Sequence, residues 1–251
     1  YDQRAVDADL LQKWKQLRED EPIILYFGKF LAAKGVGELL ATVPLILQKI
    51  PQAKFIFVGF GTNREHLEGM IHSLHSGDFE AFVAYARAGD FVEAIDFNKY
   101  FRKLSITEME HILTTGFLDH EALRFLLPLA SLTIIPSKWP EAFGMVAVEA
   151  MAAGVFPMCN YHAGLRDVVD AVERVDPAIA EIMRLDRQKF VEQLPGAVER
   201  ALNFLYPQGF DNHTARREIG RKLRQIAIDN FSWDGIARKL IQPNKPLTND
   251  Q

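Results

Sequence analysis

Short apolar segments alternate with amphipathic segments along this 251-residue chain, and this alternation restricts its fold more than any other feature. Apolar segments at 22–28 and 55–59 are each followed by a stretch with helical spacing, at 36–50 and 63–74. Strands that are apolar throughout are buried on both faces, and strands that alternate with helices form parallel sheets. We therefore expect an α/β domain, a Rossmann-like three-layer α/β/α fold with a parallel sheet of about five or six strands.

The same pattern continues towards the C-terminus. Three further apolar segments predict strands at 112–115, 132–135 and 155–159. Helical spacing predicts the remaining helices at 7–21, 121–127, 171–190, 193–205, 216–229 and 231–240.

Residues 76–110 separate the second helix from the third strand and contain two Gly-Asp steps, Gly77-Asp78 and Gly89-Asp90. Glycine ends a helix readily, and aspartate begins one by capping its free amide groups. We expect two or three short helices here and no strand, so this region is predicted to be a helical insertion. The adjacent His72 and His75 have metal-ligand spacing, but surface histidines are the commoner reading.

Composition excludes several classes of protein. A net charge of −4 gives no electrostatic reason to expect a nucleic-acid partner. The single cysteine, Cys159, excludes a disulfide framework and fits a reducing, cytoplasmic compartment. There is no apolar run of 18 residues. The chain starts at Tyr1 without an initiator methionine, so we expect a fragment whose domain spans 1–241 and is followed by a polar tail at 242–251.

The strand at 132–135 leads through a proline-bounded loop into a helix predicted from about Ala142 or Phe143 to Gly154. Gly144 in its first turn would allow close approach to the backbone, and free amides at a helix start suit a phosphate. Glu149 is the only charge in this helix, and a buried carboxylate needs partners such as ligand hydroxyls. The alternative is that Glu149 is solvated and that Glu141 helps to cap the helix.

The two acids lie in the run Pro-Ser-x-x-x-Glu-Ala-Phe-Gly-Met-x-x-x-Glu-Ala-Met-Ala-Ala-Gly, with seven residues between Glu141 and Glu149. This run resembles the E-x7-E signature of retaining glycosyltransferases with the GT-B fold. It is most similar to family 4, the glycogen-synthase-like and phosphatidylinositol-mannosyltransferase-like enzymes. The flanking residues match as well as the acids, and the resemblance spans roughly 22–240, interrupted by the insertion.

Two lysines follow the first strand, in the order Gly28-Lys29 and Lys34-Gly35. Two ammonium groups can neutralise a diphosphate without a metal, although most lysines are simply solvated. The family pattern resembled here is Gly-Arg-(four residues)-Lys-Gly, whose cations hold the donor diphosphate. Lys29 stands where the family has arginine, so the charge is kept and the bidentate contact is not.

Two glycine turns follow other strands. Gly59-Phe60-Gly61 invites a dinucleotide reading, but Arg64 stands where a third glycine belongs, which disfavours a nicotinamide dehydrogenase. It resembles instead the family's Val-Gly-x-Gly turn beside the donor pocket. Gly116-Phe117-Leu118 resembles the turn whose backbone meets the nucleotide base.

The resemblance implies the C-terminal, donor-binding half of a GT-B glycosyltransferase of hexosyltransferase type, with the N-terminal acceptor-binding domain absent from this chain. It implies catalytic roles for Glu141, Lys34 and Lys29. It implies donor binding by Gly28, Gly59, Gly61, Gly116, Phe117, Leu118, Phe143, Gly144, Met145, Val146 and Glu149. A UDP-, GDP- or ADP-sugar would be a substrate, and no cofactor or metal is expected.

Two questions stay open at this point. A non-catalytic nucleotide or sugar-phosphate binding module is the alternative function. An arginine-rich stretch from Arg216 to Arg224 offers contact with anionic lipid, hence peripheral membrane association of the full-length enzyme, although a solvated face is the simpler reading.

Overall fold

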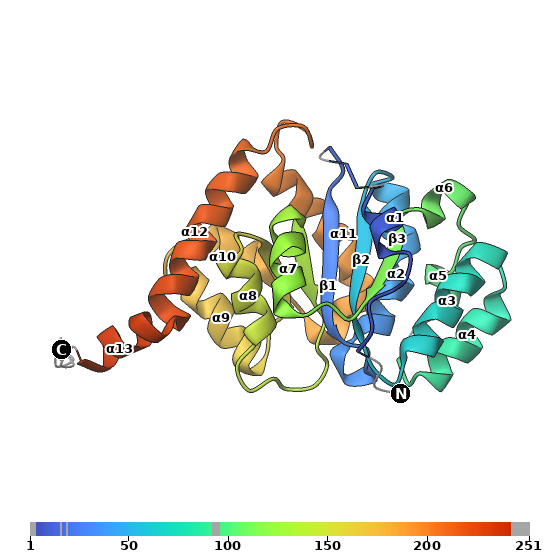
Figure 1. Cartoon of the computed structure of the whole chain (residues 1–251), viewed down its shortest axis with the longest axis horizontal. Coiled ribbons are helices and arrows are strands. Elements are labelled where there is room, and N and C mark those ends of the chain that lie inside the picture. The colour runs from blue at the N-terminus through green and yellow to red at the C-terminus, as the bar shows by residue number, and fades with distance from the viewer. Residues whose placement is uncertain (1–3, 16, 19, 92–95, 242–251) are drawn as a thin grey trace.

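The computed structural model describes residues 4–15, 17–18, 20–91 and 96–241. Within these residues six strands form one sheet in the order β3-β2-β1-β4-β5-β6, and neighbouring strands are parallel throughout (Figure 1). Helices cover both faces of the sheet. The predicted Rossmann-like three-layer α/β/α fold is therefore confirmed.

The strands are β1 (Ile23–Lys29), β2 (Lys54–Phe60), β3 (Ile112–Gly116), β4 (Leu132–Ile135), β5 (Phe156–Asn160) and β6 (Arg184–Leu185). Along β1, side chains alternate between two apolar cores. Ile24 and Tyr26 belong to one core, and Leu25 and Phe27 belong to the other. Burial on both faces explains why the sequence of this strand is apolar without interruption.

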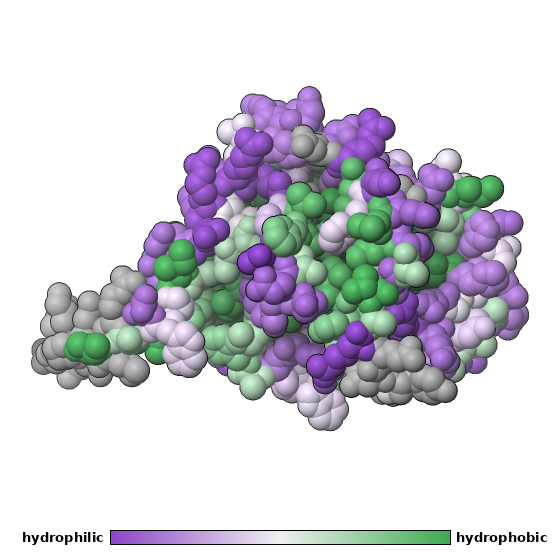
Figure 2. Space-filling model, viewed as in Figure 1, coloured by the Kyte–Doolittle hydropathy of each residue, from purple (hydrophilic) through white to green (hydrophobic). Residues whose placement is uncertain are grey.

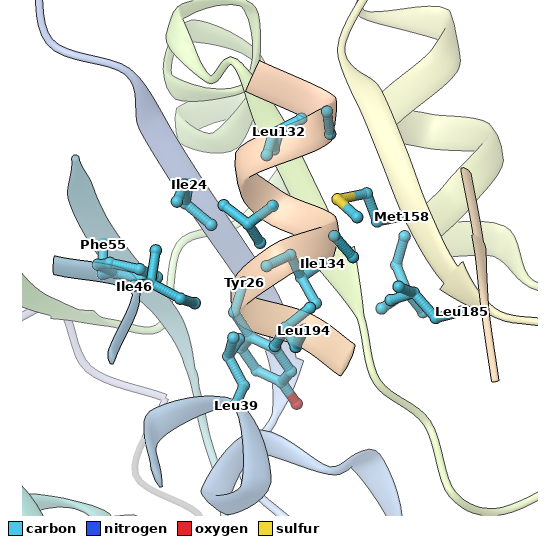
Figure 3. Packing of buried hydrophobic residues seen from close by; sticks show 14 of the residues in the cluster. Ile24, Tyr26, Leu39, Ile46, Phe55, Leu132, Ile134, Met158, Leu185 and Leu194 are labelled. Carbon is cyan, nitrogen blue, oxygen red and sulfur yellow. The ribbon is translucent and has the colours of Figure 1, made fainter. Parts of the chain in front are cut away.

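The first core lies under α2 (Val36–Lys49) and α11 (Phe190–Leu205). Leu39 and Ile46 of α2, with Leu194 of α11, pack around Ile24 and Tyr26 (Figure 3). The second core lies under α1 (Leu10–Trp14) and α7 (His120–Leu126). As predicted, Asp119 caps α7 by accepting a hydrogen bond from Ala122 N.

The insertion is helical in its described part. It continues α3 (Arg64–Ser76) with α4 (Phe79–Ala88), α5 (Phe97–Tyr100) and α6 (Ile106–Met109). Asp78 accepts a hydrogen bond from Ala81 N and so caps α4. No strand occurs between β2 and β3 among the described residues, which leave out 92–95. The prediction of helices without an added strand is confirmed for the described part.

The continuous helical reading of 171–190 was wrong. The helix α9 (Ala163–Glu173) ends early, α10 (Pro177–Met183) begins anew with Asp176 as its cap, and β6 then joins the sheet. A proline cannot continue a helix from the preceding turn but suits a first turn, so the chain restarts there. Among the described residues, three short 3-10 helices complete the connections: η1 (Ala32–Lys34), η2 (Leu127–Leu129) and η3 (Arg187–Lys189).

The two ends of the described chain compare differently with the predictions. Of the helix predicted at 7–21, the described residues show only α1 with five residues, and Asp7 before it is hydrogen-bonded to the end of β3. Near the C-terminus, α12 (Thr214–Phe231) and α13 (Trp233–Ile241) form as predicted. The predicted polar tail at 242–251 lies outside the described residues. In the view of Figure 2, the surface over α12 and the insertion is largely hydrophilic, and apolar residues gather between them.

Candidate active site

The strands β1 and β4 are neighbours in the sheet, but the chain continues from them to opposite sides, to β2 and to β5. Loops that leave in opposite directions open a crevice at the carboxyl ends of parallel strands, where such sheets bind ligands. A cavity of about 220 Å³ lies there, and its wall includes Gly28, Lys29, Lys34, Glu141 and Val146. The fold thus joins residues that the sequence places more than 100 positions apart.

An ion pair joins the two loops that flank this crevice. Lys34 Nζ lies 2.8 Å from Glu141 Oε1, and Ser137 Oγ donates a hydrogen bond to the same oxygen. The Glu141 side chain is 15% exposed, so its charge is partly desolvated and depends on these donors. Lys34 is more accessible, at 35%, and so keeps contact with the crevice.

Backbone contacts hold the same loops in place. Lys138 N and Trp139 N both donate to Ala33 O, at 2.9 and 3.2 Å. A Cβ atom at Gly35 would lie 2.2 Å from the carbonyl oxygen of Pro136, so glycine is what allows this approach. The position of Lys34 beside Glu141 is therefore set by packing of the loops as well as by charge.

Lys29 differs from Lys34 in having no polar partner among the described residues. Its side chain is exposed at the end of β1, and its carbonyl accepts a hydrogen bond from Tyr26 Oη at 2.8 Å. Tyr26 also lines the cavity, and burial raises the pKa of its hydroxyl. A free ammonium group beside a paired one is an arrangement that an anionic ligand would complete.

Gly59 and Gly61 do not line the cavity but lie against the end of β1 and the residues that follow it. A Cβ atom at Gly59 would lie 1.9 Å from Gly28 O, and one at Gly61 would lie 2.7 Å from Phe30 O. These two glycines let the ends of β1 and β2 pack closely, and they act on the site through the position of Gly28 and the following loop.

The helix after this loop begins later than expected. α8 (Met145–Ala152) has Gly144 as its N-cap, at φ +76°, so Phe143 and Gly144 precede the helix. The predicted start near Ala142 or Phe143 is too early, because a left-handed residue at 144 interrupts the helical dihedrals. No side chain caps α8, so its first amides stay available at the crevice. The predicted end is confirmed: Gly154 also has φ +76°.

Glu149 lies on α8 one turn after Val146, on the same face. It is half-buried, and its carboxylate has no hydrogen bond or ion pair with the described residues. Burial raises its pKa, although the nearby His120 opposes this effect. A half-buried carboxylate without a donor is a candidate for hydroxyl groups brought by a ligand.

The turn at 116–118 is covered by the N-terminal segment of the described chain. Phe117 N donates to Ala5 O at 2.9 Å, and Asp7 N donates to Thr115 O at the same distance. The Leu118 side chain is buried in the second core. Gly116 and Phe117 therefore face residues 4–7, and none of the three lines the cavity around Lys34 and Glu141.

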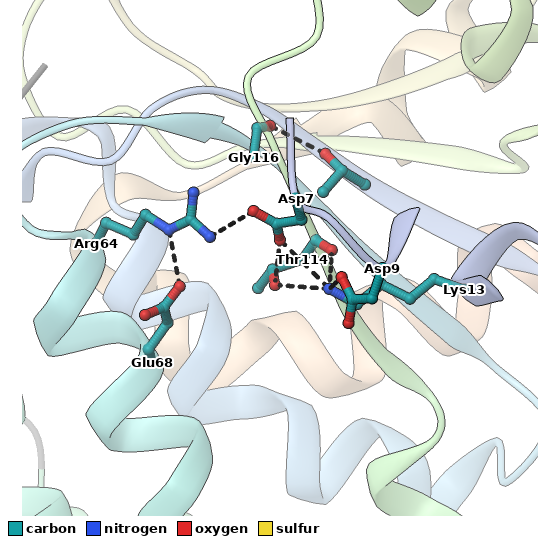
Figure 4. A network of polar contacts seen from close by, with 8 residues as sticks. Asp7, Asp9, Lys13, Arg64, Glu68, Thr114 and Gly116 are labelled. Atoms are coloured by element: carbon teal, nitrogen blue, oxygen red, sulfur yellow. Dashed lines mark hydrogen bonds and ion pairs between the residues drawn. The ribbon is translucent and has the colours of Figure 1, made fainter. Parts of the chain in front are cut away.

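A polar network anchors this covering segment (Figure 4). Asp7 accepts hydrogen bonds from Arg64 Nη2 at 2.5 Å, from Thr114 Oγ1 at 3.1 Å and from Lys13 Nζ at 3.3 Å. Burial alone would raise the pKa of Asp7, but the two cations outweigh it and lower the pKa below its usual range. Arg64, which stands where a dinucleotide motif has its third glycine, thus has a structural partner in Asp7.

Comparison with known families gives this geometry a context. Residues 8–175 match the family described as Glycosyl transferases group 1, and residues 116–240 match Family 4 Glycosyltransferase in conflict systems. The first match alone covers well over half of the chain. This chain belongs to the glycosyl transferases group 1 family. The resemblance to GT-B, family 4-like enzymes inferred from the E-x7-E run is confirmed.

Individual relatives and solved structures are consistent with this family assignment. An uncharacterized glycosyltransferase of Methanocaldococcus jannaschii is 25% identical over 232 residues, which cover 91% of this chain and 46% of that protein. Sucrose-phosphate synthase of Thermosynechococcus elongatus has TM-score 0.58 at 25% identity, over 93% of this chain and 47% of its own. The C-terminal domain of a glycosyl transferase group 1 family protein (LpcC) of Francisella tularensis has TM-score 0.53 at 15% identity, over 92% of this chain and 96% of its own.

The chain spans about half the length of the curated relatives it matches. Sequence reasoning on this group 1 domain missed three residues that shape the site: Tyr26, Ser137 and His162. Tyr26 and Ser137 line the cavity, and His162 Nε2 donates to Ser137 O at 2.8 Å. Tyr26 is hidden in an apolar strand, and Ser137 reads as an ordinary loop residue, so no local signal marks either one.

Two further findings concern reactive groups. Cys159 is fully buried, and burial followed by the charge of Glu141 raises the pKa of its thiol, as expected for a structural residue. In the part of the chain that the structure describes, no three histidine, cysteine, aspartate or glutamate side chains form a group that could hold a metal ion.

Proposed function

We propose that this chain is the nucleotide-sugar-binding domain of a retaining glycosyltransferase of hexosyltransferase type. One observation supports it above the others: the Lys34–Glu141 ion pair lies in the crevice between β1 and β4, with unpaired Lys29 in the same wall. A nucleotide-sugar carries a diphosphate for the cations and hydroxyls for the carboxylate. This arrangement therefore matches the donor in charge and in hydrogen bonding.

In this proposal each residue has a separate role. Lys29 and Lys34 neutralise the diphosphate, with the amides at the start of α8 as further donors. Glu141 and the backbone of Phe143–Met145 hold the sugar. Glu149 accepts hydrogen bonds from the ribose hydroxyls. The nucleotide itself is a substrate with a uridine, guanosine or adenosine base, and no cofactor enters the scheme.

Retention of configuration is proposed to follow from reaction on one face of the sugar. The bond from the anomeric carbon to the phosphate oxygen breaks, and the acceptor oxygen bonds to the same face. The acceptor proton passes to the leaving phosphate, whose growing charge the two lysines stabilise. In this scheme the lysines stabilise the transition state more than the ground state, which is what catalysis requires.

A second domain is proposed to supply the acceptor. The similar LpcC structure is a C-terminal domain that the chain covers almost completely, and longer relatives are only half covered. We expect an N-terminal acceptor-binding domain to form the facing wall. Holding two reactants in place can be worth about 7–11 kcal/mol of barrier, so this chain alone should bind donor and transfer almost none.

Calorimetric titration of the chain with UDP-, GDP- and ADP-sugars and with NAD tests the proposal. One nucleotide-sugar should bind, and NAD should not. A Glu149→Gln variant removes the carboxylate with little change of shape, and Arg200→Gln, an exposed change on α11, is its matched control. If NAD binds best, or if no nucleotide-sugar binds, the proposal is wrong.

The alternative is a non-catalytic module that binds a nucleotide or sugar phosphate. Donor binding alone does not separate the two functions. The two functions are separated by joining the chain to the N-terminal half of the longer protein and assaying sugar transfer with retained configuration. Binding without any transfer by that longer protein would favour the module, and robust transfer by the chain alone would contradict the division into two domains.

Membrane attachment of the longer protein also stays a prediction, as does its cytoplasmic location. Among the described residues, every helix is too short or too polar to cross a membrane. The surface that would meet anionic lipid is the arginine-rich part of α12.

A further inference from the structure

A second cavity of about 280 Å³ lies at the opposite end of the strands from the crevice. Its wall combines residues at the end of α8 with residues of α12. α8 starts at the crevice and ends at Ala152, just before β5 begins, so this cavity is at the amino ends of the strands. The wall consists of Pro128, Ala153, Gly154, Arg216, Arg217, Gly220, Arg221 and Arg224.

Two glycines create this meeting of α8 and α12. A Cβ atom at Gly220 would lie 2.4 Å from the carbonyl oxygen of Gly154, so only glycine fits at 220 without displacement. Gly154 itself has φ +76°, which turns the chain into β5. The close approach brings one face of α12 against the turn, and the arginines of that face surround the space that remains.

Arg216 is built into the wall. Its Nη2 donates to Pro128 O and Ala130 O, both at 2.7 Å. Its Nε is buried and has no hydrogen-bond partner. Two carbonyls thus fix the Arg216 guanidinium at the cavity, and three of its five N–H donors, those of Nε and Nη1, stay without a partner among the described residues.

The other three arginines carry unpaired charges. Arg217, Arg221 and Arg224 are exposed, and none has a hydrogen bond or ion pair with the side chains of the described residues. Their neighbour Lys222 on the same helix differs, because it pairs with Asp176 at 3.0 Å. No acidic side chain lines the described cavity.

Such an arrangement costs stability in the empty protein. Like charges one turn apart on a helix repel each other. Solvated surfaces usually mix both signs, which removes this cost. Three guanidinium groups without an acceptor, beside the Arg216 group that two carbonyls hold, call for a ligand that supplies negative charge and several oxygens, and a phosphate group matches the planar guanidinium fork.

We propose that this arginine cavity is a binding site for a phosphate group, separate from the crevice at Lys34 and Glu141. The ligand is a phosphorylated molecule that is either free in solution or a phospholipid headgroup. Both sources share the chemistry that the arginines recognise. Exposed Leu129, next to Pro128 of the wall, would contact the lipid in the second case.

Inorganic pyrophosphate is the probe for a soluble ligand. The Lys29→Ala/Lys34→Ala variant serves as the background, because those lysines offer pyrophosphate a competing site. Adding Arg217→Gln, Arg221→Gln and Arg224→Gln should weaken pyrophosphate binding about tenfold or more, since one lost charged hydrogen bond already costs about that factor. The matched control adds Arg174→Gln and Arg200→Gln, two exposed arginines elsewhere, and should leave pyrophosphate affinity unchanged.

Two further measurements locate the site and its ligand. In the wild-type chain, pyrophosphate should shift the amide NMR signals of Gly154 and Gly220. This measurement does not depend on whether the arginine variant folds. Sedimentation with vesicles of phosphatidylcholine and phosphatidylglycerol in equal amounts, against phosphatidylcholine alone, tests the lipid source. Loss of either kind of binding in the arginine variant supports the proposal. Unchanged binding of pyrophosphate and of vesicles by the arginine variant overturns it. The proposal is also overturned if pyrophosphate shifts neither glycine in the wild-type chain and that chain does not bind vesicles.

Discussion

The two ends of α8 place charge in opposite ways. Both ends are marked by glycine with φ +76°, Gly144 before the helix and Gly154 after it. At the first end a carboxylate and an ammonium group are paired, with Lys34 Nζ 2.8 Å from Glu141 Oε1. At the second end four guanidinium groups surround a cavity without any acid in its described wall. A mixed pair suits a ligand with hydroxyls and phosphate, whereas a single sign suits an anion alone.

α12 ties these ends together by lying alongside α8 in the opposite direction. Its last residue, Phe231, packs edge-on against Phe143 with ring centroids 5.7 Å apart. Earlier in the same helix, Gly220 meets Gly154. One helix pair therefore supports two chemically different surfaces, because α8 runs from the carboxyl ends of the strands to their amino ends.

The largest expected difference between the ends concerns phosphate recognition in the nucleotide. Lys29→Ala/Lys34→Ala should weaken nucleoside-diphosphate binding by roughly 1.5–3 kcal/mol for each lost charged contact, with much less effect on the bare nucleoside. Added salt should mimic the substitutions. Calorimetry with UDP and uridine, or the best-bound base, measures both. The control Arg174→Ala/Arg200→Ala, two exposed arginines outside both sites, should leave UDP affinity unchanged, and equal losses for nucleoside and nucleotide would place the lysines away from phosphate.

Stability distinguishes the ends through their glycines. Gly220→Ala should lower the free energy of unfolding by about 1–3 kcal/mol, because its Cβ would lie 2.4 Å from Gly154 O. Gly196→Ala in α11 is the matched control. Its Cβ meets nothing nearer than Arg200 Nη1 at 3.6 Å, so it should be stabilising by about 0.4–1 kcal/mol. Urea denaturation measures both, and a harmless Gly220→Ala would contradict the tight packing of α8 and α12.

Within α8, Glu149 tests whether the donor contacts extend along the helix. Glu149→Ala should weaken nucleoside-diphosphate binding by roughly 1–3 kcal/mol. The fold should survive, because alanine suits a helix and the carboxylate has no internal partner to lose. Calorimetry and thermal unfolding of the same variant separate the two effects. Unchanged binding with a lower melting temperature would show that Glu149 is structural.

The smallest expected effect is on pH dependence, and it concerns the loop before α8 alone. Oε1 of the buried Glu38 lies 2.6 Å from Nζ of Lys138 in that loop. Burial raises the pKa of Glu38 to about 7, although Lys138 opposes it. The folded state therefore holds this proton more tightly than the unfolded state, so the contribution of Glu38 to stability decreases as pH rises from about 4.5 to about 7.

The size of this effect is at most about 1.4 kcal/mol per pH unit. Glu38→Gln should remove it, and the difference in unfolding free energy between wild type and variant should change across that range. Above it the difference should be constant. A difference that does not vary with pH would show that folding does not raise the pKa of Glu38.

Much of the fold followed from spacing in the sequence. Apolar segments became strands within one or two residues, and Asp78 and Asp119 cap the helices that they were predicted to cap. Local rules failed at 171–190, where two residues pair with β5 as β6. So short a strand carries no periodic signal, because only its neighbour in the sheet stabilises it.

By itself, the sequence determined the alternation of strands and helices, the two acids seven residues apart and the family. These depend on chemistry within one or two turns of the chain, which spacing records directly. Tertiary structure alone decided that Lys34 meets Glu141, that residues 4–7 cover the turn at Gly116, and that arginines of α12 surround the end of α8. These contacts depend on the order of strands in the sheet and on close backbone approach, which long-range packing decides.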